Sequence, residues 1–212
     1  MYVPGHFRQD DVEALHAFMQ QYSFAILTSV RDGVPFATHL PLLLDVSMGS
    51  NGSLIGHVAR TNPHWEGLDG EQAVAIFHGP HAYVSPAWYQ APNLVPTWNY
   101  IAVHAIGRVQ VLHDRARIRE IVAKSVATYE AARTASTGQT PWEFPDDSPV
   151  IEGMLGHIVG IEISIERLEG KWKLSQNHPI ARRRQVIERL RDGDQSAREV
   201  AAYMQAMLDG DS

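Results

Sequence analysis

Two short segments of the chain place a cation beside hydroxyl and amide donors, a combination that binds phosphate groups. The first segment runs from Arg60 through Thr61 to Asn62, where a strand ends and a helix is expected to begin. Backbone N–H groups at the start of that helix would add to the positive field of the guanidinium. The alternative is that Asn62 only caps the helix and Arg60 is a solvated surface charge. The sequence alone leaves both open.

The second segment lies between Lys171 and Asn177, at the end of an expected strand. Side chains alternate along a strand, so Lys171, Lys173 and Ser175 share one face, and Gln176 and Asn177 follow just beyond it. Two cations next to a hydroxyl and two amides suit a phosphate. The alternative is a solvated hairpin edge on which the lysines discourage pairing with another strand.

A third polar group interrupts an apolar strand at Thr38-His39-Leu40-Pro41. Proline has no N–H to give to a sheet, so Pro41 leaves a neighbouring carbonyl without its partner and predicts an edge, a bulge or a bend. A ligand could form hydrogen bonds there. An edge strand with an internally satisfied His39 explains the pattern equally well.

The segment from Phe77 to Tyr100 concentrates aromatic and imidazole side chains between prolines. We interpret it as a long crossover rather than a helix, because each proline removes a backbone donor and restricts the residue before it. Flat side chains with a polar tip suit a planar ligand or a subunit contact, and packing of the crossover is the alternative. The Gly-Pro pair between His78 and His81 disfavours shared metal ligation, and no metal site is expected. The large side chains are His78, His81, Tyr83, Trp88, Tyr89, Trp98 and Tyr100.

The composition narrows the class of protein. A chain of 212 residues without cysteine fits one domain, or one domain with a helical appendage, and cannot use disulfides, thiolate zinc sites or a cysteine nucleophile. Its formal net charge of −6 argues against attraction to nucleic acid over the whole surface. No apolar run reaches the roughly 20 residues of a membrane helix, and the N-terminus lacks the pattern of a secretory signal. We expect a cytoplasmic protein that does not enter a membrane.

Hydrophobic periodicity predicts short strands joined by tight turns, with a few helices. Asp10-Asp11 caps a first helix, Asp32-Gly33 joins a hairpin, and Glu169-Gly170 joins a second hairpin. Strands are expected at 24–30, 34–44, 54–58, 73–77, 100–112, 158–168 and 171–174, and helices at 61–68, about 114–133, 150–155 and 179–208, the last broken near Gly193. The predicted class is α+β, mainly β: a small antiparallel barrel surrounded by helices. We divide it into a barrel domain, 1–178, and a C-terminal helical extension, 179–212, packed on the same domain.

The ordered succession of unusual peptides resembles the PaiB family of FMN-binding negative transcriptional regulators. The peptides that carry the resemblance span nearly the whole chain: MYVPGHF, FATHLPLLL, GHVARTNPHW, FHGPHAYVSPAWY, VPTWNYIAVHAIG and IVGIEISIERLEGKWKLSQN. The resemblance implies an FMN-binding split β-barrel of antiparallel strands, similar to pyridoxamine phosphate oxidase and flavin reductases, that forms a homodimer with flavin at the subunit interface. In one departure, Ala181 and three arginines follow the SQN peptide, where the family usually has an acidic residue.

The resemblance implies FMN as the cofactor and ranks the candidate binding residues. For the phosphate, the expected contacts are Arg60 and Lys173, supported by Thr61, Asn62, Ser175 and Gln176. For the edge of the isoalloxazine ring, they are Thr38, His39 and Leu40. For an aromatic wall contributed across the dimer, they are Trp98 and Tyr100.

Three functions follow as hypotheses. The first is a flavin-binding regulator whose interaction with DNA or protein depends on FMN, with the cluster from Arg182 to Arg184 as the basic patch for DNA. The second is a flavin reductase or oxidase, in which His39, His78 and His81 could act on protons near the flavin, because imidazole titrates near neutral pH. The third is a split barrel whose degenerate site binds another planar molecule, such as haem, or nothing at all.

Overall fold

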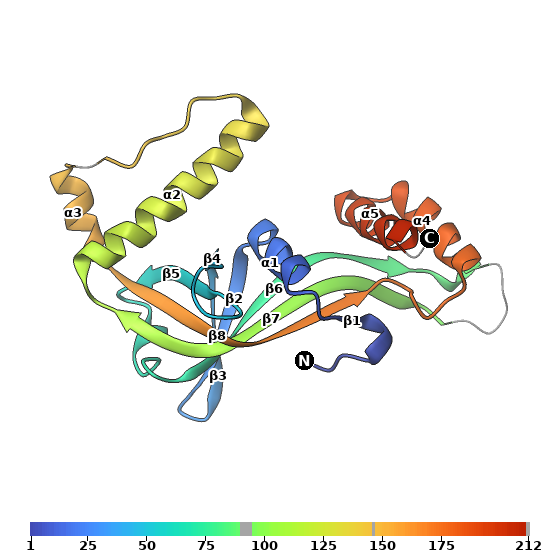
Figure 1. Ribbon diagram of the computed structural model, residues 1–212, viewed down its shortest axis with the longest axis horizontal. Helices are drawn as coiled ribbons and strands as arrows, with labels where there is room; N and C mark the ends of the chain where they lie inside the picture. Colours follow the sequence, from blue (N-terminus) through green and yellow to red (C-terminus); the bar gives the residue numbers. More distant parts are fainter. Residues whose placement is uncertain (90–94, 146, 211–212) are drawn as a thin grey trace. The chain divides into compact units, whose positions relative to one another are not determined.

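The computed structural model describes residues 1–89, 95–145 and 147–210 (Figure 1). Its chain forms two compact units. One unit comprises Met1–Phe18, Phe77–His104 and Glu169–Ser212, and the other comprises Met19–Ile76 and Ala105–Leu168. We call them the N/C unit and the middle unit. Helix α1 and three long strands contribute residues to both. The predicted domain division at residue 178 stays a prediction.

The strands follow the order β3-β2-β6-β7-β8-β5-β4, and β1 pairs separately with β8. Every pair with an assigned register, among them β2 with β3 and β5 with β8, is antiparallel. The predicted α+β class with antiparallel strands is therefore confirmed. Their bounds are β1 Arg8–Gln9, β2 Phe24–Arg31, β3 Val34–Pro41, β4 Leu43–Asp45, β5 Ser53–Ala59, β6 Gln72–Val84, β7 Thr97–Leu112 and β8 Ile158–Lys173.

In the middle unit, β2 and β3 form the hairpin that Asp32-Gly33 predicts. Asp32 has φ 51° and Gly33 has φ 78°. Positive φ at both central residues gives the turn whose twist matches that of the flanking strands. The resulting register places Leu27 opposite Thr38 and Ile26 opposite His39.

The chain bends after Pro41, as predicted. Strand β3 ends at Pro41, and the N–H of buried Leu42 donates to the Ser23 carbonyl at 2.9 Å before β4 pairs with β5. A Cβ atom on Gly56 of β5 would lie 2.8 Å from the Pro41 carbonyl oxygen, which is too close for any side chain. Glycine at position 56 therefore lets β5 approach the backbone at Pro41 closely.

Helix α2, Arg115–Thr137, belongs to the middle unit, where it packs against β5 and buries Ile118 and Ile121. Asp114 caps its start by accepting from the Arg117 N–H at 2.8 Å, and Gly138 ends it with φ 69°. The predicted end near residue 133 was one turn too early. Among the described residues, neither α2 nor any other helix is long and apolar enough to cross a membrane.

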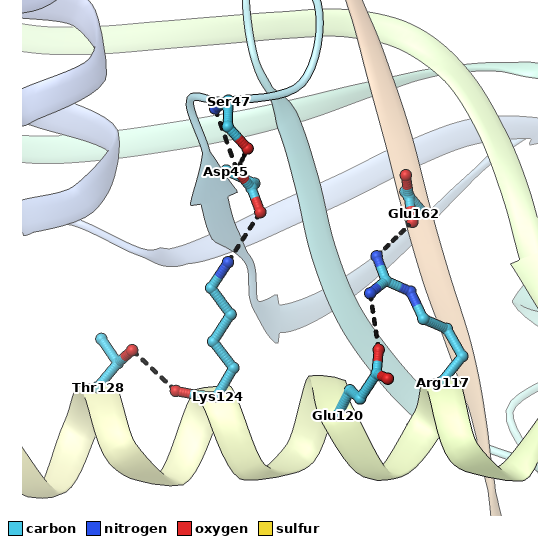
Figure 2. Close-up of polar contacts among 7 residues, drawn as sticks. All are labelled: Asp45, Ser47, Arg117, Glu120, Lys124, Thr128 and Glu162. Atoms are coloured by element: carbon cyan, nitrogen blue, oxygen red, sulfur yellow. Dashed lines mark hydrogen bonds and ion pairs between the residues drawn. The ribbon is translucent and has the colours of Figure 1, made fainter.

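Two ion pairs hold the side of α2 to strands of the middle unit (Figure 2). The Lys124 Nζ lies 2.9 Å from Asp45 at the end of β4, and Arg117 lies 3.0 Å from Glu162 of β8. A hydrogen bond from Ser47 and the neighbouring Lys124 ammonium hold the pKa of Asp45 below its usual range. The helix is thus oriented by charges at the rim of an apolar contact.

In the N/C unit, β8 runs straight through the predicted second hairpin. Gly170 lies opposite Gln9 of β1, and a Cβ atom there would sit 2.7 Å from the Gln9 carbonyl oxygen and against Leu15 of α1, Val12–Gln21. The predicted turn at Glu169-Gly170 is therefore wrong. The glycine permits close packing of β1 and α1. Both Asp32-Gly33 and Glu169-Gly170 resemble turn sequences, but only the first forms a turn.

The described part of the aromatic segment is mostly strand, so the predicted crossover is wrong. The predicted strand 73–77 is confirmed but ends too early. Strand β6 continues to Val84 and β7 begins at Thr97, with a 3-10 turn, η3, at Pro86–Tyr89. Residues 90–94, which include Pro92, lie outside the described residues. Strand β2 pairs with β6 only at Val74–Ile76, so Pro80 occupies a part of β6 that needs no N–H on that side.

The C-terminal residues form α4, Ile180–Arg191, and α5, Gln195–Gly210, which lie side by side (Figure 1). The predicted break near Gly193 is confirmed. Buried Val186, Ile187 and Leu190 of α4 and Val200 and Met204 of α5 supply apolar faces in this pair. The remaining elements are α3, Pro149–Leu155, and two 3-10 turns, η1 at Gly5–Phe7 and η2 at Pro63–Trp65, the last being all that forms of the predicted helix 61–68.

Candidate functional site

A buried imidazole organises the polar residues of the middle unit. His64 is 1% exposed, and both of its ring nitrogens have partners. Its Nδ1 lies 2.7 Å from the Thr38 Oγ1 on β3, and its Nε2 lies 2.9 Å from the Ser29 Oγ on β2. A neutral imidazole has one donor and one acceptor, so both hydroxyls are oriented by the same ring.

Asn62 completes this group, which we call the His64 cluster: Ser29, Thr38, Asn62 and His64. The Asn62 Nδ2 donates to Thr38 Oγ1 at 3.1 Å, and its Oδ1 accepts from the His64 backbone N–H at 2.9 Å and caps η2. The structure therefore brings two predicted site residues, Thr38 and Asn62, together. Sequence reasoning missed His64 and Ser29, although the histidine stands two residues after the capping asparagine in the TNPHW peptide.

The surroundings keep the His64 ring neutral. Burial lowers the pKa of His64, and the positive charge of Arg31 lowers it further. Arg31 pairs with Glu66 at 3.0 Å and also donates to the Pro63 carbonyl. A hollow of about 340 Å³ opens beside the cluster, lined by Ser29, Val30, Arg31, Asp32, His64, Glu66, Gly67 and Leu68. A polar ligand group there would meet fixed donors and acceptors.

Arg60 lies near the cluster in sequence, but its guanidinium holds the end of α3. The Nε donates to the Gly156 carbonyl at 2.8 Å and Nη2 donates to the Ile158 carbonyl at 3.0 Å. Thr61 is exposed. A phosphate contact by Arg60 would have to use the donors left over from these two bonds.

His39 and Leu40 lie on opposite faces of β3, with His39 exposed and Leu40 buried. Alternation along the strand puts Leu40 on the Thr38 face. Of this predicted ring-edge group, Thr38 belongs to the His64 cluster, and Leu40 can contribute only its backbone or an apolar contact.

The second group of predicted residues lies in the N/C unit around Lys173. Its Nζ donates to the Trp98 carbonyl at 2.6 Å and to the Thr97 hydroxyl. Burial lowers the pKa of Lys173, and nearby Lys171 lowers it further. A cation with reduced solvation gains more from an anionic partner than a surface lysine does.

Ser175 and Gln176 follow Lys173 on a backbone that the fold holds in an unusual conformation. Ser175 has φ 65°, a region that L residues seldom occupy, and its buried hydroxyl exchanges hydrogen bonds with Asn99. Gln176 folds back, its Oε1 accepting from the Leu174 N–H at 2.7 Å. Backbone strain of this kind is often retained at binding sites.

The predicted aromatic wall divides into an exposed and a half-buried part. Trp98 is 53% exposed, whereas the ring of Tyr100 lies 5.2 Å from the Lys171 Nζ, which also approaches the ring of Tyr2. Trp98 therefore offers a flat apolar surface, and Tyr100 is engaged with Lys171.

These residues fit the chemical parts of a flavin mononucleotide. In the N/C unit, Lys173 offers a partly desolvated cation of the kind that a phosphate needs. In the middle unit, Thr38 offers a hydroxyl oriented by His64, of the kind that a ring edge needs. The open order of antiparallel strands agrees with the split β-barrel that the resemblance implies.

Comparison with known proteins identifies the family. Residues 1–167 match the family model described as "Putative FMN-binding domain", so the chain belongs to this FMN-binding family, and FMN is its cofactor. The chain is 34% identical over 211 residues to the protein "Protease synthase and sporulation protein PAI 2" of Bacillus subtilis, covering 98% of each. It is 30% identical over 234 residues to an uncharacterised protein of Aspergillus fumigatus, covering 89% of this chain and 90% of that protein. The resemblance to the PaiB family is thereby confirmed.

Solved structures agree on the fold. The flavocytochrome Anf3 from Azotobacter vinelandii superposes with a TM-score of 0.59 at 14% identity, over 81% of this chain and 72% of that chain. The FAD and haem binding protein from Mycobacterium smegmatis superposes with a TM-score of 0.58 at 16% identity, over 78% of this chain and 73% of that chain. The split-barrel prediction is confirmed by these likenesses, which at such identities bear on the fold alone.

Proposed function

We propose that this PaiB-type FMN-binding protein acts in the cytoplasm as a homodimeric negative regulator of transcription, with flavin at the subunit interface. The observation that carries the proposal is the family match over residues 1–167, together with a relative whose name refers to protease synthesis and sporulation. A chain without cysteine also needs no oxidising compartment in order to fold.

This proposal keeps the FMN contacts that the resemblance implies. Thr38, with His39 and Leu40, meets the ring edge, and Lys173 is the principal cation for the phosphate. Arg60, Thr61, Asn62, Ser175 and Gln176 support the phosphate, and Trp98 and Tyr100 form the wall. When bound, FMN can accept and donate electrons reversibly.

The hydrogen bonds of His64 favour a binding role over acid–base catalysis. Its two ring nitrogens are committed to Thr38 and Ser29, and burial keeps the ring neutral. A general acid or base needs a nitrogen within reach of the reacting proton. His64 therefore acts as a positioning residue that holds the Thr38 hydroxyl in one orientation.

FMN binding by Lys173 is tested by titrating the flavin-free chain with FMN and following flavin fluorescence. Lys173→Met should weaken binding at least tenfold, because an ionic hydrogen bond to a phosphate in a partly desolvated site contributes about 1.5–3 kcal/mol. Arg108→Met, which removes an exposed cation paired with Glu166, is the matched control and should bind normally. Equal affinity of both variants and the wild type would remove Lys173 from the site.

If the regulator acts through DNA, α4 supplies the cations: Arg184 is exposed and Arg182 is half-buried. Arg183 is buried, so the basic patch is formed by Arg182 and Arg184 rather than by the whole cluster. Replacing both with Glu should abolish a gel shift on the chain's own upstream DNA while FMN binding persists. A shift that survives this double replacement would exclude the patch as the DNA contact.

A further inference from the structure

A hollow of about 420 Å³ in the N/C unit lies outside both groups of FMN candidates, sharing only Trp98 with them. Its volume is within the range of small-molecule sites. One side is formed by β6, η3 and β7, and the other by the corner between α4 and α5. The lining residues are His81, Ala82, Tyr83, Trp88, Trp98, Arg189, Leu190, Asp192, Gly193, Asp194, Ser196 and Ala197.

The strand side of this hollow is aromatic and open. The ring centroid of Trp98 lies 5.8 Å from that of Tyr83 and 6.0 Å from that of His81. Tyr83 is 47% exposed, and with Trp98 it leaves large ring surfaces uncovered by the chain itself. Grouped exposed aromatics of this kind mark binding surfaces rather than packing.

The helical side is fixed to the aromatic side by hydrogen bonds. The Ser196 Oγ accepts from the His81 N–H at 2.9 Å and donates to the His81 carbonyl at 2.8 Å. Asp194 caps α5 by accepting from the Ala197 N–H at 2.8 Å. The backbone of the corner is therefore fixed to β6 at His81, and the Asp194 carboxylate is held at the start of α5.

The charges of the lining favour a positive ligand. Asp192 and Asp194 carry two negative charges, and Arg189 carries one positive charge. Burial and the neighbouring His81 lower the pKa of His78, whose ring lies 5.0 Å from that of His81, so His78 adds no positive charge at neutral pH. The faces of Trp and Tyr rings are themselves electronegative and attract cations.

We propose that this hollow binds a small organic cation, such as a quaternary ammonium group, against Tyr83, Trp88 and Trp98. The proposal goes beyond FMN binding, because the residues that distinguish it, Tyr83, Asp192 and Arg189, belong to neither FMN group. An anionic ligand would be attracted by Arg189 instead, and a neutral apolar ligand would be indifferent to all three charges. The three ligand classes therefore predict different responses to the same substitutions.

The test compares choline with its neutral carbon analogue, 3,3-dimethylbutan-1-ol, by calorimetric titration of the full, FMN-loaded protein. Choline should bind roughly tenfold more tightly than the analogue, as expected for a cation between aromatic faces. Tyr83→Ala should weaken choline binding by a similar factor, and Tyr83→Phe, which keeps the ring, should not. Flavin absorbance of each variant monitors FMN loading separately, so loss of the cofactor cannot be mistaken for loss of this site.

Substitutions of the charged lining residues show whether the hollow prefers a cation, because choline affinity should rise or fall with the charge that is removed. Asp192→Asn should weaken choline binding severalfold, and Arg189→Gln should strengthen it. Reversed signs would show an anion site, and equal binding of choline and the neutral analogue would show an apolar one. Either result, or no choline binding at any tested concentration, would overturn the proposal.

Discussion

Replacing Thr38 with Val probes the His64 cluster directly, because valine keeps the shape and removes only the hydroxyl. That hydroxyl bonds the His64 Nδ1 at 2.7 Å and accepts from Asn62 Nδ2 at 3.1 Å. Each bond contributes about 1 kcal/mol, and a buried polar atom left without a partner costs about 1–3 kcal/mol. We expect Thr38→Val to lower the free energy of unfolding by about 2–3 kcal/mol.

Urea denaturation of the flavin-free chain at pH 7.5 measures this loss without a contribution from FMN binding. Thr38→Ser retains a hydroxyl and should recover most of the stability, and Thr61→Val, at an exposed neighbouring position, should change it little. With FMN present, Thr38→Val should also weaken flavin binding, because the ring edge loses an oriented hydroxyl. A Thr38→Val loss no larger than that of Thr61→Val would refute the idea that His64 and Asn62 depend on Thr38.

Three further predictions concern parts that hold the fold together. In a double-mutant cycle, the half-exposed pair Asp45–Lys124 should have a coupling energy of only about 0.5–1 kcal/mol, and a value near 3 kcal/mol would contradict its solvent screening. Because the folded-state pKa of His64 is lowered, its contribution to stability is complete above the unfolded value of about 6.5 and falls below it. His64→Gln should reduce this slope in denaturation midpoints without abolishing it, because burial also lowers the pKa values of His57, His78, His104 and His178. Gly170→Ala should lower the free energy of unfolding by about 1–3 kcal/mol, because the added methyl group crowds Leu15. An unchanged thermal unfolding transition would exclude close packing of β1 and α1 on Gly170.

Local signals in the sequence predicted the local parts of the fold. The Asp32-Gly33 turn, the caps at Asp11 and Asp114 and the break near Gly193 depend on residues within one or two turns of each other. Each of these signals has a direct backbone cause, such as positive φ or an unpaired helix N–H. These local signals were sufficient to predict the α+β class and the division of the C-terminal residues into two helices.

The features that were predicted wrongly or missed depend on contacts between residues far apart in the sequence. Gly170 was predicted to form a turn because no nearby residue reveals that β1 pairs with β8 at this position. Pro80 was predicted to interrupt a strand because the local sequence does not reveal where the pairing of β2 with β6 ends. The His64 cluster was missed for the same reason. Ser29 of β2 and Thr38 of β3 bond the two nitrogens of the His64 ring, and Asn62 accepts from the His64 backbone N–H at the start of η2. Only the folded chain brings the two strands to this ring.

The identity of the bound chromophore tests the central claim most directly. The freshly purified protein should show the absorption bands of oxidised flavin, and mass spectrometry of the material released by denaturation should identify FMN in equimolar amount with the chain. A haem Soret band would contradict the account. So would a colourless protein that fails to bind FMN when titrated with it.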